Sequence, residues 1–227
     1  MTLIKDENEI RIFIENVLPP LEHDEVYIVV LTARKKYCPT ISSSMEVVAR
    51  DIIKTNDTDK IIRKLKKLSI VEGLYTDKNG EIIPNDAFVL YILLDPRSML
   101  KAYKEFNKDI NEWIYSHLVG EKNLQFYRDI DIKLFSAIHR SPSKKNYFII
   151  DIDKKDETLL NIIVEKLNSI KWVTETRGGY HILVDRCDGE MVYKISQMKL
   201  SDVEIKKEIM TPIPGTLQGG FLVHRYF

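Results

Sequence analysis

The chain has 227 residues, of which 44% are hydrophobic and 30% are charged, and its 34 basic residues balance its 34 acidic ones. The apolar content is too high for a disordered chain, and the charge balance excludes a polybasic or polyacidic protein but permits a local basic groove. No apolar run approaches the roughly 20 residues that span a bilayer. The first residues lack the apolar stretch of a signal peptide, and two cysteines suit a reducing compartment, so we expect a cytoplasmic protein without membrane contact.

The first half of the chain mixes the patterns of helices and strands, which predicts an α/β module over residues 1–146. Apolar spacing predicts a helix from Glu9 to Val17 that ends before Pro19. A β-branched run predicts a buried strand over 26–31. The other predicted elements are helices over Met45–Ile53 and Thr58–Leu68 (capped by Asp57 or Thr58), a strand over Ala87–Leu94 and a helix that begins after Ser98 and runs through Phe106 toward Leu118.

The second half is more regular and follows a polar stretch, 139–146, that is typical of a linker or an exposed loop. The predicted elements are a strand over 147–153, a helix over 158–170, strands over 172–176 and 180–184 joined by the turn 177–179, a helix over 189–198, and extended segments over 203–209 and 221–226. The order β-α-β-β-α-β is that of the ferredoxin-like or RRM-like split unit. We therefore expect an α+β protein of two lobes, residues 1–146 and 147–227.

This order of elements predicts where chemistry is concentrated. In such a unit the first and third strands are antiparallel neighbours, so the end of the first lies beside the start of the third. Asp151 and Asp153 end the first strand, and His181 starts the third. Because side chains two apart on a strand share a face, two carboxylates and an imidazole should meet. Such carboxylates suit Mg²⁺ or Mn²⁺, which often complete their shells with substrate phosphates, and Arg177 with the amides that follow it can hold phosphate oxygens.

Each feature alone has a more ordinary explanation. A strand that ends in Asp-x-Asp is more often a solvated strand end, and Gly178-Gly179 is more often a plain hairpin turn. A single histidine is more often structural. The prediction depends on the conjunction, because a separate topological argument brings all three groups to one place.

These residues resemble, in order, the motifs of the archaeo-eukaryotic primase (primase-polymerase) superfamily. Asp151-Ile152-Asp153 is similar to its acidic motif, and Gly179-Tyr180-His181 is similar to its small-residue-x-His motif. The segment 213–218, which contains Pro-Gly-Thr, is similar to a stretch that many plasmid and phage members carry. The resemblance covers mainly residues 147–220. It implies a two-lobed primase-like fold, here as a minimal catalytic core.

The resemblance implies a metal-dependent nucleotidyltransferase of the DNA primase or primase-polymerase type. Such an enzyme adds nucleotides from nucleoside triphosphates to a strand on a single-stranded DNA template and releases pyrophosphate. It implies that Asp151 and Asp153 bind Mg²⁺ or Mn²⁺ and that His181, assisted by Arg177 and Gly179, contacts the nucleotide. It also suggests a helicase or another replication protein as a partner.

The third acidic position of the family has the weakest match. Asp202 is the best candidate for this metal ligand, with Glu204 and Glu208 behind it. Asp202 follows Ser201, however, and is equally suited to capping a turn. Two alternatives therefore stay open: a non-catalytic primase-like nucleic-acid-binding subunit, and a metal-dependent nuclease.

Basic residues outside the motifs are candidates for nucleic-acid binding. Arg34, Lys35 and Lys36 follow a predicted buried strand and can present cations to a nucleic-acid backbone, although a solvated loop is an equally good interpretation. Arg140 and Lys144 lead into the strand that carries Asp151 and can line a template path. Because the whole chain is neutral, we expect weak and strongly salt-dependent template binding.

Overall fold

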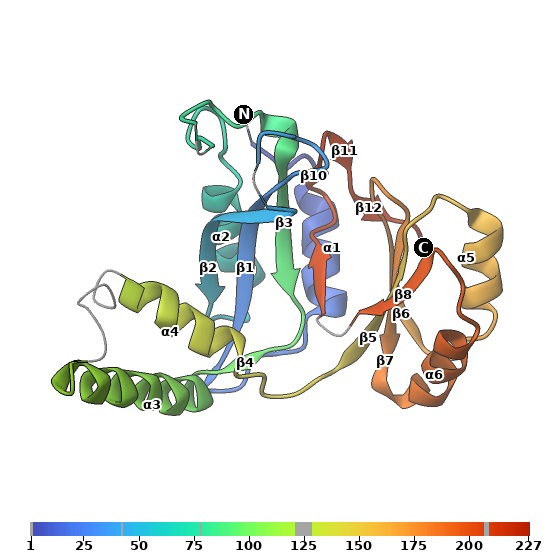
Figure 1. Ribbon diagram of the computed structural model, residues 1–227. Helices are drawn as coiled ribbons and strands as arrows, with labels where there is room; N and C mark the ends of the chain where they lie inside the picture. Colours follow the sequence, from blue (N-terminus) through green and yellow to red (C-terminus); the bar gives the residue numbers. More distant parts are fainter. Residues whose placement is uncertain (1, 42, 78, 121–128, 207–208) are drawn as a thin grey trace.

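The computed structural model describes residues 2–41, 43–77, 79–120, 129–206 and 209–227. Two antiparallel sheets stand side by side, and six α-helices accompany them in this part of the chain (Figure 1). The prediction of an α+β protein is therefore confirmed. None of the helices in these ranges is long and apolar enough to cross a bilayer.

The first sheet has its two central strands, β1 (Glu25–Arg34) and β3 (Phe88–Leu93), buried along almost their whole length. Its strand order is β11-β10-β3-β1-β2, with β4 paired to β1 and β9 paired to β3. Helices α1 and α2 cover one face through the main hydrophobic core, and parts of α3 and α4 cover the other. The remaining bounds are α1 Glu7–Val17, β2 Met45–Ile53, α2 Thr58–Leu68, β4 Arg97–Ser98, α3 Met99–Leu118, α4 Ile130–His139, β9 Met210–Pro212, β10 Leu217–Gln218 and β11 Phe221–Leu222.

Two of the predicted helix starts are confirmed by their caps. The Asp57 carboxylate accepts a hydrogen bond from the Lys60 amide at 3.1 Å, and the Ser98 hydroxyl accepts one from the Lys101 amide at 3.2 Å. Each cap satisfies a donor that the first turn of a helix leaves without an internal partner.

Residues 45–53 form strand β2, and the helix predicted there is wrong. The strand pairs with β1 from Tyr27 opposite Ile53 to Arg34 opposite Met45. The apolar spacing of this segment fits a helix and a strand equally well, but its β-branched residues, such as Val47 and Ile52, favour a strand beside a long buried neighbour.

The second sheet is built from the predicted βαββαβ unit. Its strand order is β12-β6-β7-β5-β8, so the first and third strands of the unit, β5 and β7, are antiparallel neighbours as predicted. Helices α5 and α6 share a hydrophobic core with one face of this sheet. The bounds are β5 Tyr147–Ile152, α5 Glu157–Val164, β6 Ile170–Glu175, β7 Tyr180–Asp185, α6 Gly189–Gln197, β8 Val203–Lys206 and β12 His224–Arg225.

Helix α5 ends six residues earlier than the predicted limit at Ile170, because a carboxylate from another segment binds the chain there. Asp188 accepts hydrogen bonds from the backbone amides of Asn168, at 2.6 Å, and Ser169, at 2.8 Å. These two amides are therefore unavailable for a helix. The segment they belong to is a turn that leads directly into β6.

The chain does not divide into lobes at the predicted point between residues 146 and 147. Residues 210–222 return to the first sheet as β9, β10 and β11, and β12 then re-enters the second sheet. The two sheets also share one core, in which the rings of Phe13 and Trp172 meet edge to face with centroids 5.6 Å apart. The stretch predicted as a linker or an exposed loop contacts the first sheet, since the Ser98 amide donates to the Ser141 carbonyl at 2.8 Å.

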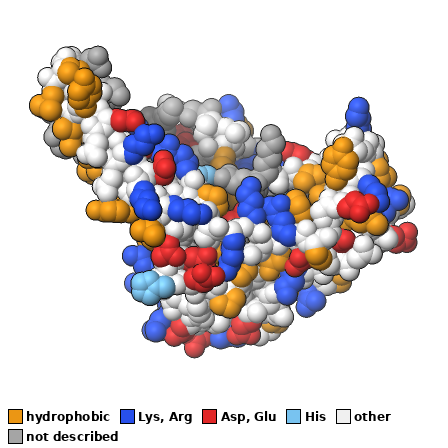
Figure 2. Space-filling model, turned by 90° about the horizontal axis from the view of Figure 1, so that it is seen from below, with side chains coloured by type: hydrophobic (Ala, Val, Ile, Leu, Met, Phe, Trp, Pro, Cys, Tyr) orange, Lys and Arg blue, Asp and Glu red, His pale blue; other side chains and the backbone are white. Residues whose placement is uncertain are grey.

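Helix α3 extends far beyond the sheet that its first turns cover (Figure 1). Ala102 near its start is buried, whereas Tyr115 and Leu118 near its end are 68% and 78% exposed. Hydrophobic side chains cover the far end of this projection (Figure 2). This end of the helix therefore stands outside the hydrophobic core.

Candidate functional site

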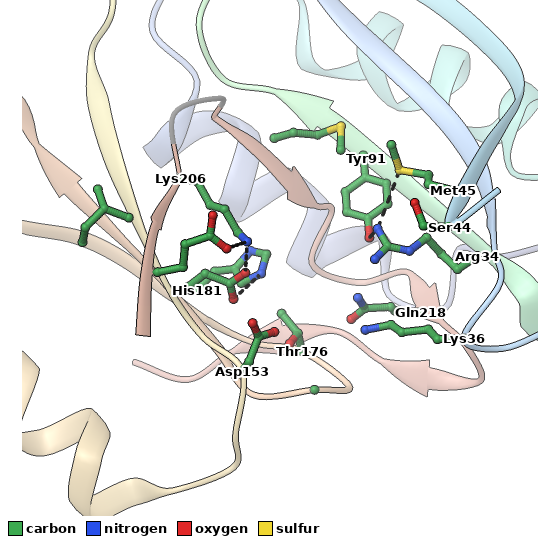
Figure 3. A pocket seen from close by; sticks show the side chains of 15 residues that line it. Arg34, Lys36, Ser44, Met45, Tyr91, Asp153, Thr176, His181, Lys206 and Gln218 are labelled. Carbon is green, nitrogen blue, oxygen red and sulfur yellow. Dashed lines mark hydrogen bonds and ion pairs between the residues drawn. The ribbon is translucent and has the colours of Figure 1, made fainter. Parts of the chain in front are cut away.

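A cleft of about 710 Å³ lies where the two sheets meet. Figure 3 shows that side chains from both sheets point into it. The wall from the first sheet and the loop after β1 includes Arg34, Lys36, Ser44, Met45, Tyr91 and Gln218. The wall from the second sheet includes Asp151, Asp153, Thr176, His181, Glu204 and Lys206. Across the cleft, a mainly cationic wall thus faces a wall that carries three carboxylates.

Asp151 and His181 occupy directly opposed positions on β5 and β7, as the sequence predicts. The Nε2 atom of His181 is 3.2 Å from Oδ1 of Asp151. The Nδ1 atom of the same ring is 3.3 Å from Oγ1 of Thr211, which belongs to β9 in the first sheet. Both ring nitrogens therefore have partners, and the imidazole is fixed between the two sheets.

Lys206 is the second partner of Asp151. Its Nζ is 3.1 Å from Oδ2 of Asp151, and it also pairs with Glu204. Burial by itself would raise the pKa of Asp151, but hydrogen bonds from His181 and Lys206 outweigh burial, so the pKa is lowered. Burial opposes the charge on Lys206, yet its two carboxylate partners raise its pKa. Asp151 is therefore ionised at neutral pH and compensated by neighbouring donors.

Two further carboxylates face the same cleft. Asp153 lies one residue beyond β5, and its backbone amide donates to the Asp202 carbonyl at 2.9 Å. Glu204 stands directly opposite Asp151 in the pairing of β5 with β8. Side chains at opposed positions share a face of the sheet, so Glu204 joins Asp151 on the cleft side.

The structure therefore changes the choice of a third acid. The carboxylate of Asp202, the residue that the sequence favours, accepts a hydrogen bond from the Ser201 hydroxyl at 3.2 Å and does not line the cleft. Glu204 does line it, whereas Glu208 lies outside the described residues. The register of the pairing explains the difference, because Asp202 precedes β8 whereas Glu204 occupies the strand position opposite Asp151.

The cleft carboxylates suit a divalent ion only if a phosphate ligand completes the coordination of that ion. In the described ranges, no three His, Cys, Asp or Glu side chains are arranged to hold a metal ion by themselves. Mg²⁺ is, however, commonly bound through one or two carboxylates and substrate phosphates. Asp151 and Asp153 offer such a pair, and the cationic wall opposite suits the phosphates. The residues therefore fit an ion that arrives with a phosphate ligand.

Only a glycine fits at position 179, because the backbone at the end of β5 lies close to it. A Cβ atom at this position would lie 1.9 Å from the Ile152 carbonyl oxygen and 2.7 Å from the Lys154 amide nitrogen. The amide of Gly179 donates to Oγ1 of Thr176 at 3.2 Å, so it is satisfied within the turn. Gly179 thus allows the turn before β7 to lie against the end of β5, and its amide is not directed at a ligand.

Arg177 is placed differently from the sequence prediction, since its side chain does not line the cleft. The guanidinium lies over the ring of Tyr37, 4.5 Å from the centroid, and donates to the Gly219 carbonyl. The Arg177 amide donates to Oε1 of Gln218 at 3.0 Å. Arg177 therefore ties the β6–β7 turn to the loop after β1 and to the β10–β11 turn.

The predicted basic residues separate into two groups. Arg34 lines the cleft and donates to the Tyr91 hydroxyl at 3.2 Å, and Lys36 also lines it. Burial, helped by the nearby Arg34, lowers the pKa of Lys36. Lys35 is exposed and is not part of the lining.

Arg140 and Lys144 lie elsewhere. Arg140 pairs with Asp109 at 2.8 Å, and Lys144 pairs with Glu22 at 3.1 Å. Lys144 also approaches Glu25 at the start of β1, which is roughly 30 Å along the strand from Arg34. Neither residue lines the cleft.

Several residues of the cleft carry no signal in the sequence. Tyr91 lines the cleft, and Thr211, which contacts the His181 ring without lining the cleft, is placed there by the pairing of β9 with β3 where the two sheets meet. Lys206 could be anticipated from the predicted last strand, since it is two positions from Glu204 and shares its face. Comparison with protein-family models, with curated proteins and with solved structures gives no match to this chain.

Proposed function

We propose that this chain is a metal-dependent nucleotidyltransferase of the primase-polymerase type, acting on nucleoside triphosphates and a single-stranded DNA template with Mg²⁺ or Mn²⁺. The observation that carries the proposal is the opposition of Asp151 and His181 at 3.2 Å, with Asp153 at the same strand end, inside a cleft that has Arg34 and Lys36 on its other wall. Acids and bases that face each other across such a cleft suit a ligand that combines a divalent ion with phosphates.

In this proposal the carboxylates and the cations have separate tasks. Asp151 and Asp153 would hold the ion together with the phosphates of the nucleotide. A bound divalent ion in such a site stabilises charge on the attacking and leaving oxygens. Lys206 forms an ion pair with Asp151, and His181, which lies 3.2 Å from the same carboxylate, is a donor of the kind that phosphate oxygens accept. Glu204 also pairs with Lys206.

Primer extension with a paired variant tests the proposal. We expect Asp151→Asn combined with Asp153→Asn to lower nucleotide incorporation on a primed single-stranded template by at least about 10³-fold in the presence of Mn²⁺, while the thermal midpoint stays close to that of the parent. Asp185→Asn is the matched control, because Asp185 is at the opposite end of β7 and is opposed to Tyr147. Retained incorporation by the double variant would reject this site.

One observation favours a second candidate, a non-catalytic nucleic-acid-binding subunit. The ion pairs of Lys206 with Asp151 and Glu204 place a cation beside the carboxylate that the enzyme needs for metal. Calorimetric titration with Mn²⁺ separates the two functions. An enzyme should bind Mn²⁺ and a nucleoside triphosphate cooperatively, whereas a binding subunit should show no cooperativity. Cleavage of labelled DNA without nucleotides would instead indicate a nuclease.

A further inference from the structure

Helix α3 carries an exposed, mainly apolar stripe on the side that faces away from the core. Its buried residues, Ala102 and Trp113, mark the inward side. The stripe consists of residues spaced three or four positions apart, which share one face of a helix: Leu100, Tyr103, Asn107, Asn111, Ile114 and Leu118. Its four apolar members are between 43% and 78% exposed. An exposed apolar surface of this kind is typical of an interaction site.

The stripe and its flank have almost the same residues in both directions from the middle of α3. Equal residues stand at equal distances before and after Asp109: Leu100 and Leu118 are nine positions away, Tyr103 and Tyr115 six, and Asn107 and Asn111 two. A two-fold interface needs a surface that is complementary to itself, because each subunit offers the same patch to the other. This helix meets that condition if two copies of it lie antiparallel about Asp109.

Helix geometry gives the contacts of such a pair. Leu100 lies level with Leu118 of the second copy, and Tyr103 lies within one position of Ile114 of the second copy. In the middle, Asn107 lies level with Asn111 of the second copy. Because an amide side chain both donates and accepts hydrogen bonds, these two can satisfy each other within the pair and fix its register.

The charges of α3 favour the antiparallel direction. Its first half, residues 99–108, has three lysines and one glutamate, whereas its second half, residues 109–118, has two acidic residues and no lysine or arginine. Arg140 already pairs with Asp109, so Glu112 supplies the remaining acidic charge of the second half. An antiparallel pair sets each basic half against an acidic half, whereas a parallel pair would set like charges side by side.

The flank of the stripe is complementary as well. In the antiparallel pair, Lys104 lies within one position of Tyr115 of the second copy. Both side chains are exposed, and an ammonium group is attracted to the face of a tyrosine ring. The two-fold axis repeats this contact, so each pair of helices has two of them.

We propose that α3 pairs antiparallel with α3 of a second copy of this chain, so that the protein forms a two-fold dimer through this stripe. The helix projects beyond the first sheet (Figure 1), and hydrophobic side chains cover its far end (Figure 2). The stripe is roughly 27 Å long, so the pair buries less than the about 1,600 Å² of a standard interface, and the dimer is a weak one. No residue of α3 lines the cleft, so the inference does not depend on the proposed function.

Sedimentation equilibrium of the full chain from about 1 µM to about 100 µM tests the dimer, since a small interface of this kind gives a micromolar Kd. We expect the mass to rise from that of one chain to that of two. Leu100→Glu and Leu118→Lys should each weaken the dimer by at least about tenfold, because each places a charge against a leucine. Tyr193→Glu is the matched control and should dimerise like the parent, because Tyr193 is 64% exposed on another helix, α6.

The combination of Leu100→Glu and Leu118→Lys in one chain tests the register. The antiparallel pair brings each introduced carboxylate level with an introduced ammonium group, so the double variant should recover most of the self-association. Both positions are exposed, so all variants should keep the thermal midpoint of the parent, measured by circular dichroism. A parent that stays monomeric at the highest concentration, single variants that associate like the parent, or a double variant no better than the single ones would overturn the proposal.

Cysteine cross-linking tests the direction of the pair. In a Cys187→Ser background, which removes the exposed native thiol, we expect a disulfide between a Leu100→Cys chain and a Leu118→Cys chain. Neither variant should cross-link to itself, because its two thiols would be roughly 27 Å apart along the helices. Cross-links that form only between like variants would show a parallel pair and overturn the inference.

Discussion

Asp151 and His181 face each other across two adjacent strands, with Oδ1 and Nε2 3.2 Å apart, at the place where the second sheet meets the first. The other ring nitrogen of His181, Nδ1, is a hydrogen-bond partner of the Thr211 hydroxyl in the first sheet. A change at His181 therefore acts on the orientation of Asp151 and on the contact between the sheets.

We expect His181→Ala to lower kcat/KM for the incoming nucleotide by about 10²-fold or more. The variant removes the imidazole, which is a hydrogen-bond donor both to Asp151 and within the cleft. Binding of a single-stranded oligonucleotide in EDTA should remain unchanged. The control is His224→Ala, since the His224 side chain is 45% exposed and pairs with Glu175 outside the cleft. Steady-state primer extension measures the effect, and an unchanged KM and turnover would exclude this role for His181.

Removal of Lys206 should strengthen metal binding. The Nζ of Lys206 is 3.1 Å from Oδ2 of Asp151, so a divalent ion must compete with it for this carboxylate. We expect Lys206→Met to lower the Kd for Mn²⁺ in the presence of a nucleoside triphosphate by about fivefold. Lys194→Met, which removes a lysine paired with Glu190 on α6, is the control. Weaker Mn²⁺ binding by Lys206→Met would contradict the competition.

The glycine pair before β7 provides a test of the fold of the site. A Cβ atom on Gly179 would lie 1.9 Å from the Ile152 carbonyl oxygen, whereas a Cβ atom on Gly178 has only Lys36 Nζ within 4 Å. We expect Gly179→Ala to reduce the free energy of unfolding by more than about 3 kcal/mol, and Gly178→Ala to change it by less than about 0.5 kcal/mol. Urea denaturation of both variants checks this, and similar stabilities would show that the turn can move away from β5.

Asp188 should make the free energy of unfolding depend on pH in the acid range. Burial would raise the pKa of Asp188, but hydrogen bonds from Asn168 and Ser169 outweigh burial, so its pKa in the folded protein lies below its ordinary value. A lowered carboxyl pKa stabilises the fold above the pKa of the unfolded chain, near 3.9, and this stabilisation is lost as the pH falls through the folded pKa.

The variant Asp188→Asn isolates this effect. We expect it to be less stable than the parent by about 1–3 kcal/mol at pH 7. The difference should shrink as the pH falls from about 4 toward 2, because the parent then loses the same charge. Urea denaturation at several pH values measures it, and a difference that does not vary with pH would contradict the assignment.

Much of the fold follows from local patterns. Helices α1, α2 and α3 and strands β1 and β3 lie close to their predicted positions, because apolar periodicity, capping residues and β-branched runs act over a few neighbouring residues. The segment 45–53 shows the limit of such patterns. Its spacing fits both element types, and its β-branched residues together with the pairing to β1 select the extended form.

The centre of the site also follows from the sequence. Once the βαββαβ order is recognised, antiparallel pairing and strand alternation bring Asp151 opposite His181 without any knowledge of side-chain packing. Alternation does not distinguish Asp202 from Glu204, which are two positions apart, and only the register of β8 against β5 places Glu204 opposite Asp151.

The sequence by itself thus determined the order of the elements, the βαββαβ unit and the meeting of an aspartate with a histidine on adjacent strands. Only the tertiary structure decided that residues 210–222 return to the first sheet, that Arg34 and Lys36 face the carboxylates, and that Arg177 lies over Tyr37 outside the cleft. The physical reason is the range of the interactions. Periodicity and pairing within one unit are set by nearby residues, whereas the partner of a side chain in another sheet depends on how the two sheets pack.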